Sequence, residues 1–182
     1  MKSANELDQQ LDLVVGFVNT LDLETGSDAI AGPDELATWL ADNELTDDLV
    51  EPTAAEVRRA AVLRAAVRDL LLAHNAGDVD TDQACTTLEE VARASRLGLR
   101  FHEGRTALEP EADGASAALG RLVATIAELM PTTEWQRLKA CRDETCRQAF
   151  YDQSRNRSRA WCSMEVCGNR EKARSFRERH GH

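Results

Sequence analysis

Two short stretches near the end of the 182-residue chain decide the fold of its last third: Cys141-Arg-Asp-Glu-Thr-Cys146 and Cys162-Ser-Met-Glu-Val-Cys167. Four residues separate the two cysteines of each stretch, and fifteen residues separate the stretches. Two close pairs joined by a spacer of this length can present four thiolates tetrahedrally to one Zn²⁺ ion. The sequence therefore predicts one structural zinc ion per chain, with Cys141, Cys146, Cys162 and Cys167 as its ligands.

An iron–sulfur cluster and four metal-free thiols are the alternatives to zinc at these cysteines. Disulfides are disfavoured because we expect a cytoplasmic protein, and the cytosol keeps thiols reduced. Four thiolates leave no open coordination position, so the zinc is expected to fold the segment and not to catalyse a reaction. The fifth cysteine, Cys85, lies beside the apolar face of a helical pattern, which predicts a buried core thiol.

Charge is distributed unevenly along the chain. Residues 136–182 contain 12 Lys+Arg and 6 Asp+Glu, a net charge of +6, whereas residues 1–135 contain 10 and 26, a net charge of −16. This separation predicts two parts with different partners. No apolar run reaches the roughly 18 residues of a membrane span, and the N-terminus has no signal-peptide pattern. We therefore expect no contact with a membrane.

Apolar residues before residue 131 recur mostly at helical spacing. They predict helices over residues 7–21, 33–40, 53–77, 81–95 and 119–130, with a capping box at Thr53 and Glu56. Residues 97–101 alternate as in a strand and turn back through residues 104–108 as a hairpin. We expect a mainly α fold: a helical domain over residues 1–131 that folds without metal, and a zinc module of a hairpin and a helix over residues 132–182.

Basic and aromatic residues interleave around the cysteines. Guanidinium groups bind phosphate and aromatic rings stack on bases, so the arginines are candidate nucleic-acid contacts. Three of them alternate along an expected extended segment, and three form a stripe on a helix capped by Asn169. These candidates are Arg155, Arg157, Arg159, Arg170, Arg174 and Arg177.

Each of these features also has a structural alternative. Phe150, Tyr151 and Trp161 can instead form a small core around the zinc, and this is the role that we favour for Phe150 and Trp161. The basic helix can instead be a solvated surface helix. Ala173, Phe176 and His180 fall at helical spacing and are expected to pack inward. In the first part of the chain, Asn19 and Thr20 either line a small ligand pocket or form local hydrogen bonds.

Four stretches of the last third together resemble the CGNR-type zinc finger, which is named for the tetrapeptide Cys167-Gly-Asn-Arg170. The others are residues 141–146, Phe150-Tyr-Asp-Gln-Ser-Arg-Asn156 and Ser158-Arg-Ala-Trp-Cys-Ser-Met164. Near the N-terminus, Leu11-Asp-Leu-Val-Val-Gly-Phe-Val-Asn-Thr-Leu21 resembles the start of the ABATE domain that commonly precedes this finger. The resemblance implies a bacterial protein, predicted to be a stress-induced transcription regulator.

These observations favour a regulator whose finger binds nucleic acid, double-stranded DNA before RNA. The acidic helical domain is then expected to sense a small-molecule ligand or to mediate self-association. One alternative is a zinc-stabilised module that docks an acidic protein, and another is a sensor that releases zinc when its thiolates are oxidised. The chain has no nucleophile-elbow serine and no glycine-rich phosphate loop, so we do not expect an enzyme.

Overall fold

The computed structural model describes residues 4–46, 50–76, 79–102 and 104–180. Its described part is mainly α-helical, as the sequence predicts. The long helices are α1 (Ala4–Val18), α2 (Pro33–Asp42), α3 (Ala54–Ala76), α4 (Asp82–Ala94), α5 (Gly114–Leu129) and α6 (Asn169–His180). The strands are β1 (Leu97–His102), β2 (Arg105–Pro110), β3 (Leu138–Ala140) and β4 (Ala149–Tyr151), with short helical turns η1 (Trp135–Arg137) and η2 (Met164–Gly168).

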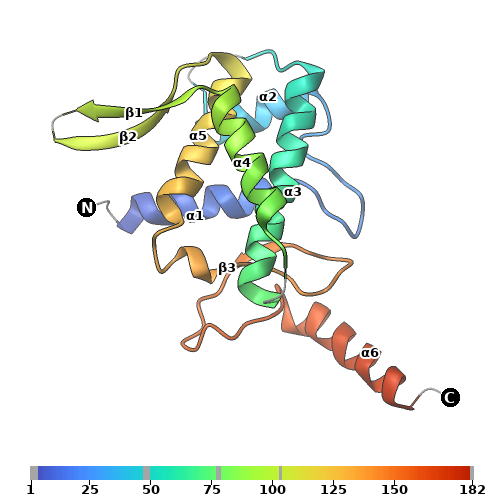
Figure 1. Ribbon diagram of the computed structural model, residues 1–182. Helices are drawn as coiled ribbons and strands as arrows, with labels where there is room; N and C mark the ends of the chain where they lie inside the picture. The colour runs from blue at the N-terminus through green and yellow to red at the C-terminus, as the bar shows by residue number, and fades with distance from the viewer. Residues whose placement is uncertain (1–3, 47–49, 77–78, 103, 181–182) are drawn as a thin grey trace.

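Helices α3, α4 and α5 stand side by side, and α1 runs across α3 and α5 (Figure 1). The apolar stripes predicted from the sequence form the core between them. In α3 this stripe includes Leu63, Val67 and Leu71, and α5 buries nearly its whole length. The helices occur where the sequence predicts them, but α1 ends at Val18 and not at Leu21, and α5 begins at Gly114, five residues before Leu119. Gly77, expected to end α3, lies outside the described residues.

A capping box begins α3, as predicted. The backbone N–H of Thr53 donates to Glu56 Oε2 at 2.8 Å, and the backbone N–H of Glu56 donates to Thr53 Oγ1 at 3.3 Å. The other oxygen of Glu56 accepts a hydrogen bond from the Ser116 hydroxyl at 2.8 Å. The same carboxylate therefore begins α3 and holds it against the start of α5.

The predicted hairpin of β1 and β2 is present and extends away from the helices (Figure 1). Its strands pair in antiparallel register, with Leu99 opposite Leu108 and Phe101 opposite Thr106. Gly104 at the turn has a φ of 75°, which favours glycine. Phe101 near the tip is 76% exposed. This hairpin therefore adds little to the core.

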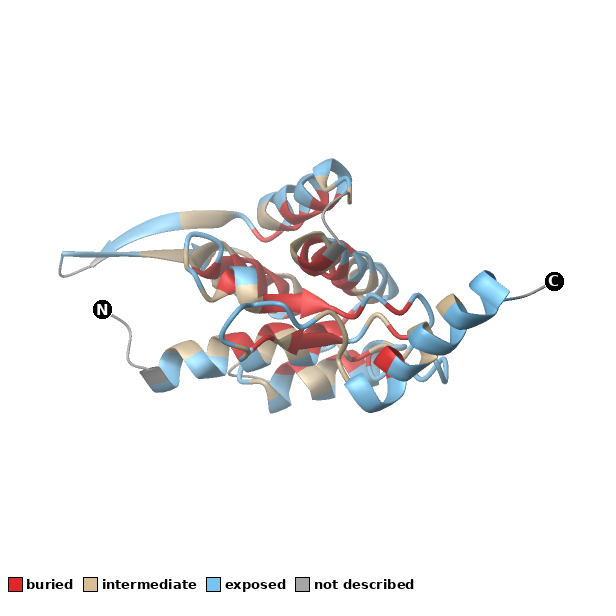
Figure 2. Cartoon of the chain, turned by 90° about the horizontal axis from the view of Figure 1, so that it is seen from below, coloured by how far each residue is buried: buried red, intermediate tan, exposed pale blue. Residues whose placement is uncertain are grey.

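The second hairpin, β3 and β4, packs into the same core as the helices. Leu138, Ala140 and Ala149 are buried together with side chains of α1, α3 and α5, and Trp135 of η1 joins them (Figure 2). The hydrophobic core is thus continuous across residues 131–132, where the sequence suggests a boundary. The zinc module is attached to the helical domain by shared packing and not by a free linker.

Helix α6 projects from the body of the protein (Figures 1 and 2). Two sequence predictions are wrong here. Asn169 does not cap the helix, because the chain already coils through η2, and Ser163 accepts the backbone N–H of Val166 at 3.3 Å instead. Ala173, Phe176 and His180 do not pack inward, and Phe176 is 58% exposed. Phe176 and His180 stack only on each other, with ring centroids 4.3 Å apart.

Candidate metal centre and basic surface

The four cysteines of the finger meet at one point although 25 residues separate the first from the last. Their Sγ atoms all lie within 4.8 Å of one another. The distance from Cys146 Sγ to Cys162 Sγ is 3.5 Å, and that from Cys162 Sγ to Cys167 Sγ is 3.7 Å. Cys141, Cys146 and Cys167 are buried, and Cys162 is half-buried. The predicted ligand set is therefore assembled.

This geometry fits a zinc ion. A tetrahedral Zn²⁺ site with Zn–S distances of about 2.3 Å requires sulfur atoms about 3.8 Å apart. Burial and the neighbouring thiols raise the pKa of Cys162 to about 12, and they raise the pKa of Cys167 further. A cluster of such thiols stays protonated unless a cation compensates for the thiolate charges. Zinc supplies that charge and cross-links the segment; the cofactor is one structural zinc ion held by this finger.

Local hydrogen bonds shape the two cysteine turns. After β3, the carboxylate of Asp143 accepts the backbone N–H of Thr145 at 3.1 Å, and the Asp143 carbonyl accepts the N–H of Cys146 at 3.0 Å. Burial raises the pKa of Asp143, but the hydrogen bonds from Thr145 outweigh burial and lower it. In the second turn, Ser163 starts η2, which carries Cys167 back to the metal.

Cys85 is exposed, so the prediction of a buried core thiol is wrong. Ala84, Leu88 and Val91 form the buried stripe of α4, and Cys85 is one residue beyond Ala84. One residue is about 100° of rotation on a helix, which turns the thiol to the solvent. Cys85 lies apart from the described metal cluster.

We predict that Cys162→Ser lowers the zinc content of the purified protein from about one ion per chain, since its thiolate cannot be replaced by a weaker hydroxyl ligand. Cys85→Ser is the matched control and should keep a full zinc load. Elemental analysis of both variants measures the ratio. A fully loaded Cys162→Ser protein would contradict the ligand assignment.

Polar side chains of the helical domain hold the finger in place. Asn19 forms a two-way bridge to the backbone of Ala149: its Oδ1 accepts the N–H at 2.7 Å, and its Nδ2 donates to the carbonyl at 3.0 Å. Asn75 Nδ2 donates to the carbonyls of Ala140 and Ala160 at 2.7 and 2.8 Å. Ala140 directly precedes Cys141, and Ala160 lies two residues before Cys162. The two asparagine side chains therefore hydrogen-bond to backbone groups of the zinc module, as the backbone of a neighbouring strand would.

One further side chain of the helical domain, that of His74, contacts the finger, whereas Thr20 bonds only within the helical domain. His74 Nδ1 donates to the Leu138 carbonyl at 2.8 Å, and burial lowers the pKa of this histidine. Thr20 bonds locally, to the Phe17 carbonyl at 2.8 Å, and accepts a hydrogen bond from Arg64 at 2.9 Å. Thr20 thus forms the expected local hydrogen bond, whereas the partner of Asn19 lies 130 residues away, and neither residue lines a pocket described.

Three of the six candidate arginines, Arg159, Arg170 and Arg174, have partners within the chain, and the first two of them link parts of the fold. The Arg159 guanidinium lies 4.8 Å from the Phe150 ring centroid and donates to the Trp161 and Cys162 carbonyls, the first at 2.9 Å. Phe150 is buried against the cysteines and Trp161 is half-buried there, which agrees with the structural alternative for both. Arg159 therefore closes the finger over its own core.

Arg170 joins three parts of the protein. It pairs with Glu24 of the α1–α2 loop at 3.0 Å and with Asp143 at 3.5 Å, and it donates to the Thr145 hydroxyl at 3.1 Å. Its guanidinium thus links the start of α6 to the first cysteine turn and to the helical domain. Nothing in the sequence pattern indicates this, because Glu24 lies 146 residues away.

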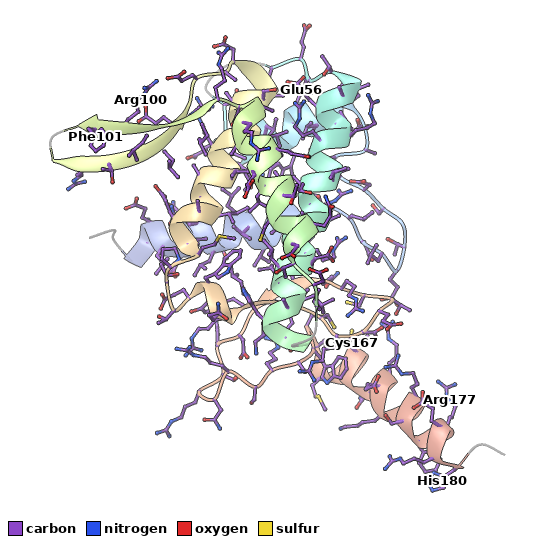
Figure 3. The ribbon with its side chains drawn as sticks, viewed as in Figure 1. Glu56, Arg100, Phe101, Cys167, Arg177 and His180 are labelled. Atoms are coloured by element: carbon purple, nitrogen blue, oxygen red, sulfur yellow. The ribbon has the colours of Figure 1, made fainter. Side chains whose placement is uncertain are left out.

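The other four candidates are exposed. Arg155 and Arg157 occupy a turn, and Arg157 has a φ of 50°, so the predicted extended segment is wrong. Arg174 pairs with Glu171 on α6. Among the described residues, the side chains of Arg155, Arg157 and Arg177 have no hydrogen-bond or ion-pair partner; Figure 3 shows Arg177 near the free end of α6.

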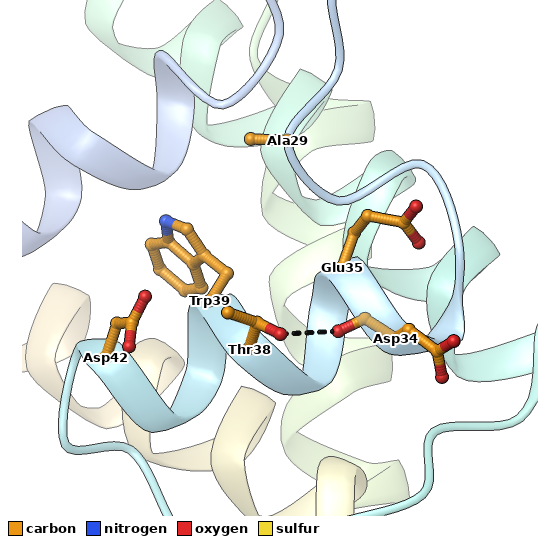
Figure 4. Close-up of a pocket in the computed structure, with 6 residues that line it drawn as sticks. All are labelled: Ala29, Asp34, Glu35, Thr38, Trp39 and Asp42. Carbon is orange, nitrogen blue, oxygen red and sulfur yellow. Dashed lines mark hydrogen bonds between the residues drawn. The ribbon is translucent and has the colours of Figure 1, made fainter.

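A surface hollow beside Trp39 is lined by an aromatic ring and by acidic side chains (Figure 4). It has a volume of about 380 Å³ and is open to solvent. Asp34, Glu35 and Asp42 line the hollow together with Trp39, and the only hydrogen bond drawn joins Thr38 to the Asp34 backbone. No buried polar group points into the hollow, so it identifies no ligand. No described helix is long and apolar enough to cross a membrane.

Comparison with known families gives two matches. A model named ABATE, described as "Putative stress-induced transcription regulator", matches residues 11–132, about two thirds of the chain. A model of the CGNR zinc finger matches residues 137–180, which contain all four clustered cysteines. A search of curated proteins gives no significant match.

Proposed function

The chain belongs to the ABATE family of transcription regulators and carries a CGNR zinc finger, and from this premise we propose that it regulates transcription in the cytoplasm by binding double-stranded DNA through the finger. In this proposal the protein is not an enzyme. Four thiolates fill the coordination sphere of its metal, so the zinc serves only to shape the binding surface.

One observation carries the proposal: the finger exposes arginines that its own fold does not use. Arg159 and Arg170 serve the structure, but Arg155, Arg157 and Arg177 have no partner among the described residues. Unpaired guanidinium groups on the surface are suited to bind a ligand with many negatively charged oxygens, such as the phosphates of DNA. Arg174 is the fourth candidate, because its ion pair with Glu171 on the surface is easily exchanged for a phosphate.

The charge distribution supports the same surface. Residues 1–135 carry a net charge of −16 and repel phosphate, whereas residues 136–182 carry +6. Even after the formal −2 of a zinc ion with four thiolates is subtracted, the finger remains positive. The protein is therefore expected to approach DNA with the finger first and the helical domain facing away.

Changing Arg174 and Arg177 together to alanine is expected to weaken duplex binding. Each phosphate contact contributes about −0.9 to the slope of log K against log salt, so the magnitude of the slope should decrease by about 1.8. The zinc content should not change, because neither residue is a ligand. Arg93→Ala, an exposed arginine on α4, is the matched control. An unchanged slope in the double variant would remove α6 from the proposed interface.

The type of partner is tested in the native host. Nucleic acid that crosslinks to the protein can be purified with it and sequenced. Enrichment at a few promoters is the expected result. Enrichment of transcripts would replace DNA by RNA, and the absence of nucleic acid would favour docking of the arginine surface on an acidic protein.

A further inference from the structure

A buried ion pair lies beneath the turn that carries Arg155 and Arg157. Lys139, in the middle of β3, is 4% exposed, and Asp152, directly after β4, is 0% exposed. Lys139 Nζ donates to Asp152 Oδ2 at 2.8 Å. A lysine is almost never buried this deeply unless it is paired, so the pair calls for a physical explanation.

The pair fixes both ends of the turn. Lys139 Nζ also donates to the carbonyls of Arg157, at 2.6 Å, and of Arg159, at 3.2 Å. All three ammonium protons thus have acceptors. Asp152 accepts the backbone N–H groups of Ser154, at 2.9 Å, and of Arg159, at 3.0 Å. The whole segment from residue 153 to 159 is therefore wrapped around two buried charges.

Arg137 strengthens the same arrangement from outside. One of its guanidinium nitrogens donates to the carbonyls of Asp152 and Ser154, at 2.8 and 3.1 Å. Burial tends to raise the pKa of Asp152, but the hydrogen bonds from Lys139 and the turn hold it well below its usual range. The carboxylate is thus ionised, as the bonds to the turn require.

Stability alone does not account for this pair. Replacing a buried ion pair by apolar residues of similar volume is often neutral or stabilising, so a strand in a core gains little from it. What the pair specifies is backbone shape: it holds Arg157 at a φ of 50°, a conformation that non-glycine residues seldom adopt. The side chains of Arg155 and Arg157 are exposed on the outer side of this held turn.

We propose that Lys139 is a positioning residue for nucleic-acid binding: through the carbonyls of Arg157 and Arg159 it holds the turn that presents Arg155 and Arg157 to the phosphate backbone. Lys139 itself touches no ligand. A preorganised turn binds with a smaller loss of conformational entropy than a flexible one. The inference rests on the proposed function. It adds the buried contacts that fix the positions of Arg155 and Arg157, two of the four arginines proposed to bind phosphate.

The test is a double-mutant cycle on the zinc-loaded full chain, measured as binding to a DNA duplex over a range of salt concentrations. Lys139→Gln is expected to reduce the magnitude of the slope of log K against log salt toward that of the Arg155→Gln/Arg157→Gln protein, a change of up to about 1.8. Adding Lys139→Gln to that double variant should cause no further loss, because the contacts through which it acts are already gone. Zinc content and helical signal serve as controls of folding.

Each outcome separates the inference from the proposed function. Wild-type affinity and slope in Lys139→Gln, or a loss that adds fully to that of the arginine variant, would overturn the positioning role alone. A wild-type protein that does not bind nucleic acid would overturn the proposed function and the inference with it. If Lys139→Gln fails to hold zinc, the same cycle is run with Lys139→Met combined with Asp152→Asn, which removes both buried charges together. Wild-type binding by that variant, or a loss that adds fully to that of the arginine variant, would likewise overturn the positioning role.

Discussion

Removal of zinc is expected to destabilise the helical domain together with the finger. Leu138, Ala140 and Ala149 belong to the core of the helices, and Cys141 follows β3 without a linker. Once the metal leaves, the β3–β4 hairpin loses the cross-link that closes it. The apolar ends of α1 and α3 then lose the strands that cover them, and Asn19 and Asn75 lose their backbone partners.

The magnitudes point the same way. Zinc binding to small structural sites has an apparent free energy of about 10–16 kcal/mol, whereas whole domains are stable by about 5–15 kcal/mol. Loss of even about 5 kcal/mol should lower the melting temperature of a chain of this size by roughly 10–20 °C. Circular dichroism at 222 nm, recorded during heating with and without a chelator, measures the shift.

A single melting transition is expected for the zinc-loaded protein, and readdition of zinc to the chelated sample should restore it. Cys85→Ser should respond to the chelator as the wild type does. If the chelated protein keeps its helical signal and melts at the wild-type temperature, residues 1–131 fold independently, as their own apolar stripes suggest on sequence grounds, and the shared core contributes little.

Asp28→Ala should destabilise the helical domain strongly. Arg64, whose side chain is 4% exposed, donates hydrogen bonds to both carboxylate oxygens of Asp28, at 2.6 and 2.8 Å. Removing the carboxylate leaves a buried guanidinium whose remaining polar contact is the Thr20 hydroxyl. Breaking a buried pair in this way costs about 3–5 kcal/mol. Urea unfolding at pH 7 measures the loss.

The matched control is Glu89→Ala, which breaks the exposed pair of Glu89 with Arg93 on α4 and should cost no more than about 0.5 kcal/mol.

The ion pair of Asp28 also predicts that the stability of the protein depends on pH. The hydrogen bonds from Arg64 lower the pKa of Asp28 in the folded state. Its contribution is therefore present above the unfolded pKa of about 3.9 and is lost as the pH falls below that value. Equal destabilisation by Asp28→Ala and Glu89→Ala at pH 7 would contradict the role given to Asp28.

Local patterns are enough to predict the helices, the first hairpin and the zinc ligands. The apolar stripes of α3 and α5, the capping box of Thr53 and Glu56, and the spacing of the cysteines each depend on residues close in the chain. Such features carry their own geometry: a helical period, a cap, or a pair of thiolates on one turn.

Contacts between distant segments could not be predicted in this way. Asn19 lies 130 residues from Ala149, and Glu24 lies 146 residues from Arg170, so no local pattern links them. The apolar period of α6 shows that Phe176 and His180 share a face, but it does not reveal whether anything covers that face. Lys139, between the buried Leu138 and Ala140, is the one sequence signal of the buried pair, since a strand that is buried on both sides rarely contains a lysine.

The most direct test of the central claim, that arginines organised by zinc bind DNA phosphates, is the salt dependence of duplex binding by the zinc-loaded full chain between about 50 and 200 mM salt. The wild type is compared with a variant in which Arg155, Arg157, Arg174 and Arg177 are changed to glutamine. Four contacts predict a wild-type slope of log K against log salt of about −3.6 and a nearly flat line for the variant. Salt-independent binding by the wild type, or equal slopes for the two proteins, would contradict the claim.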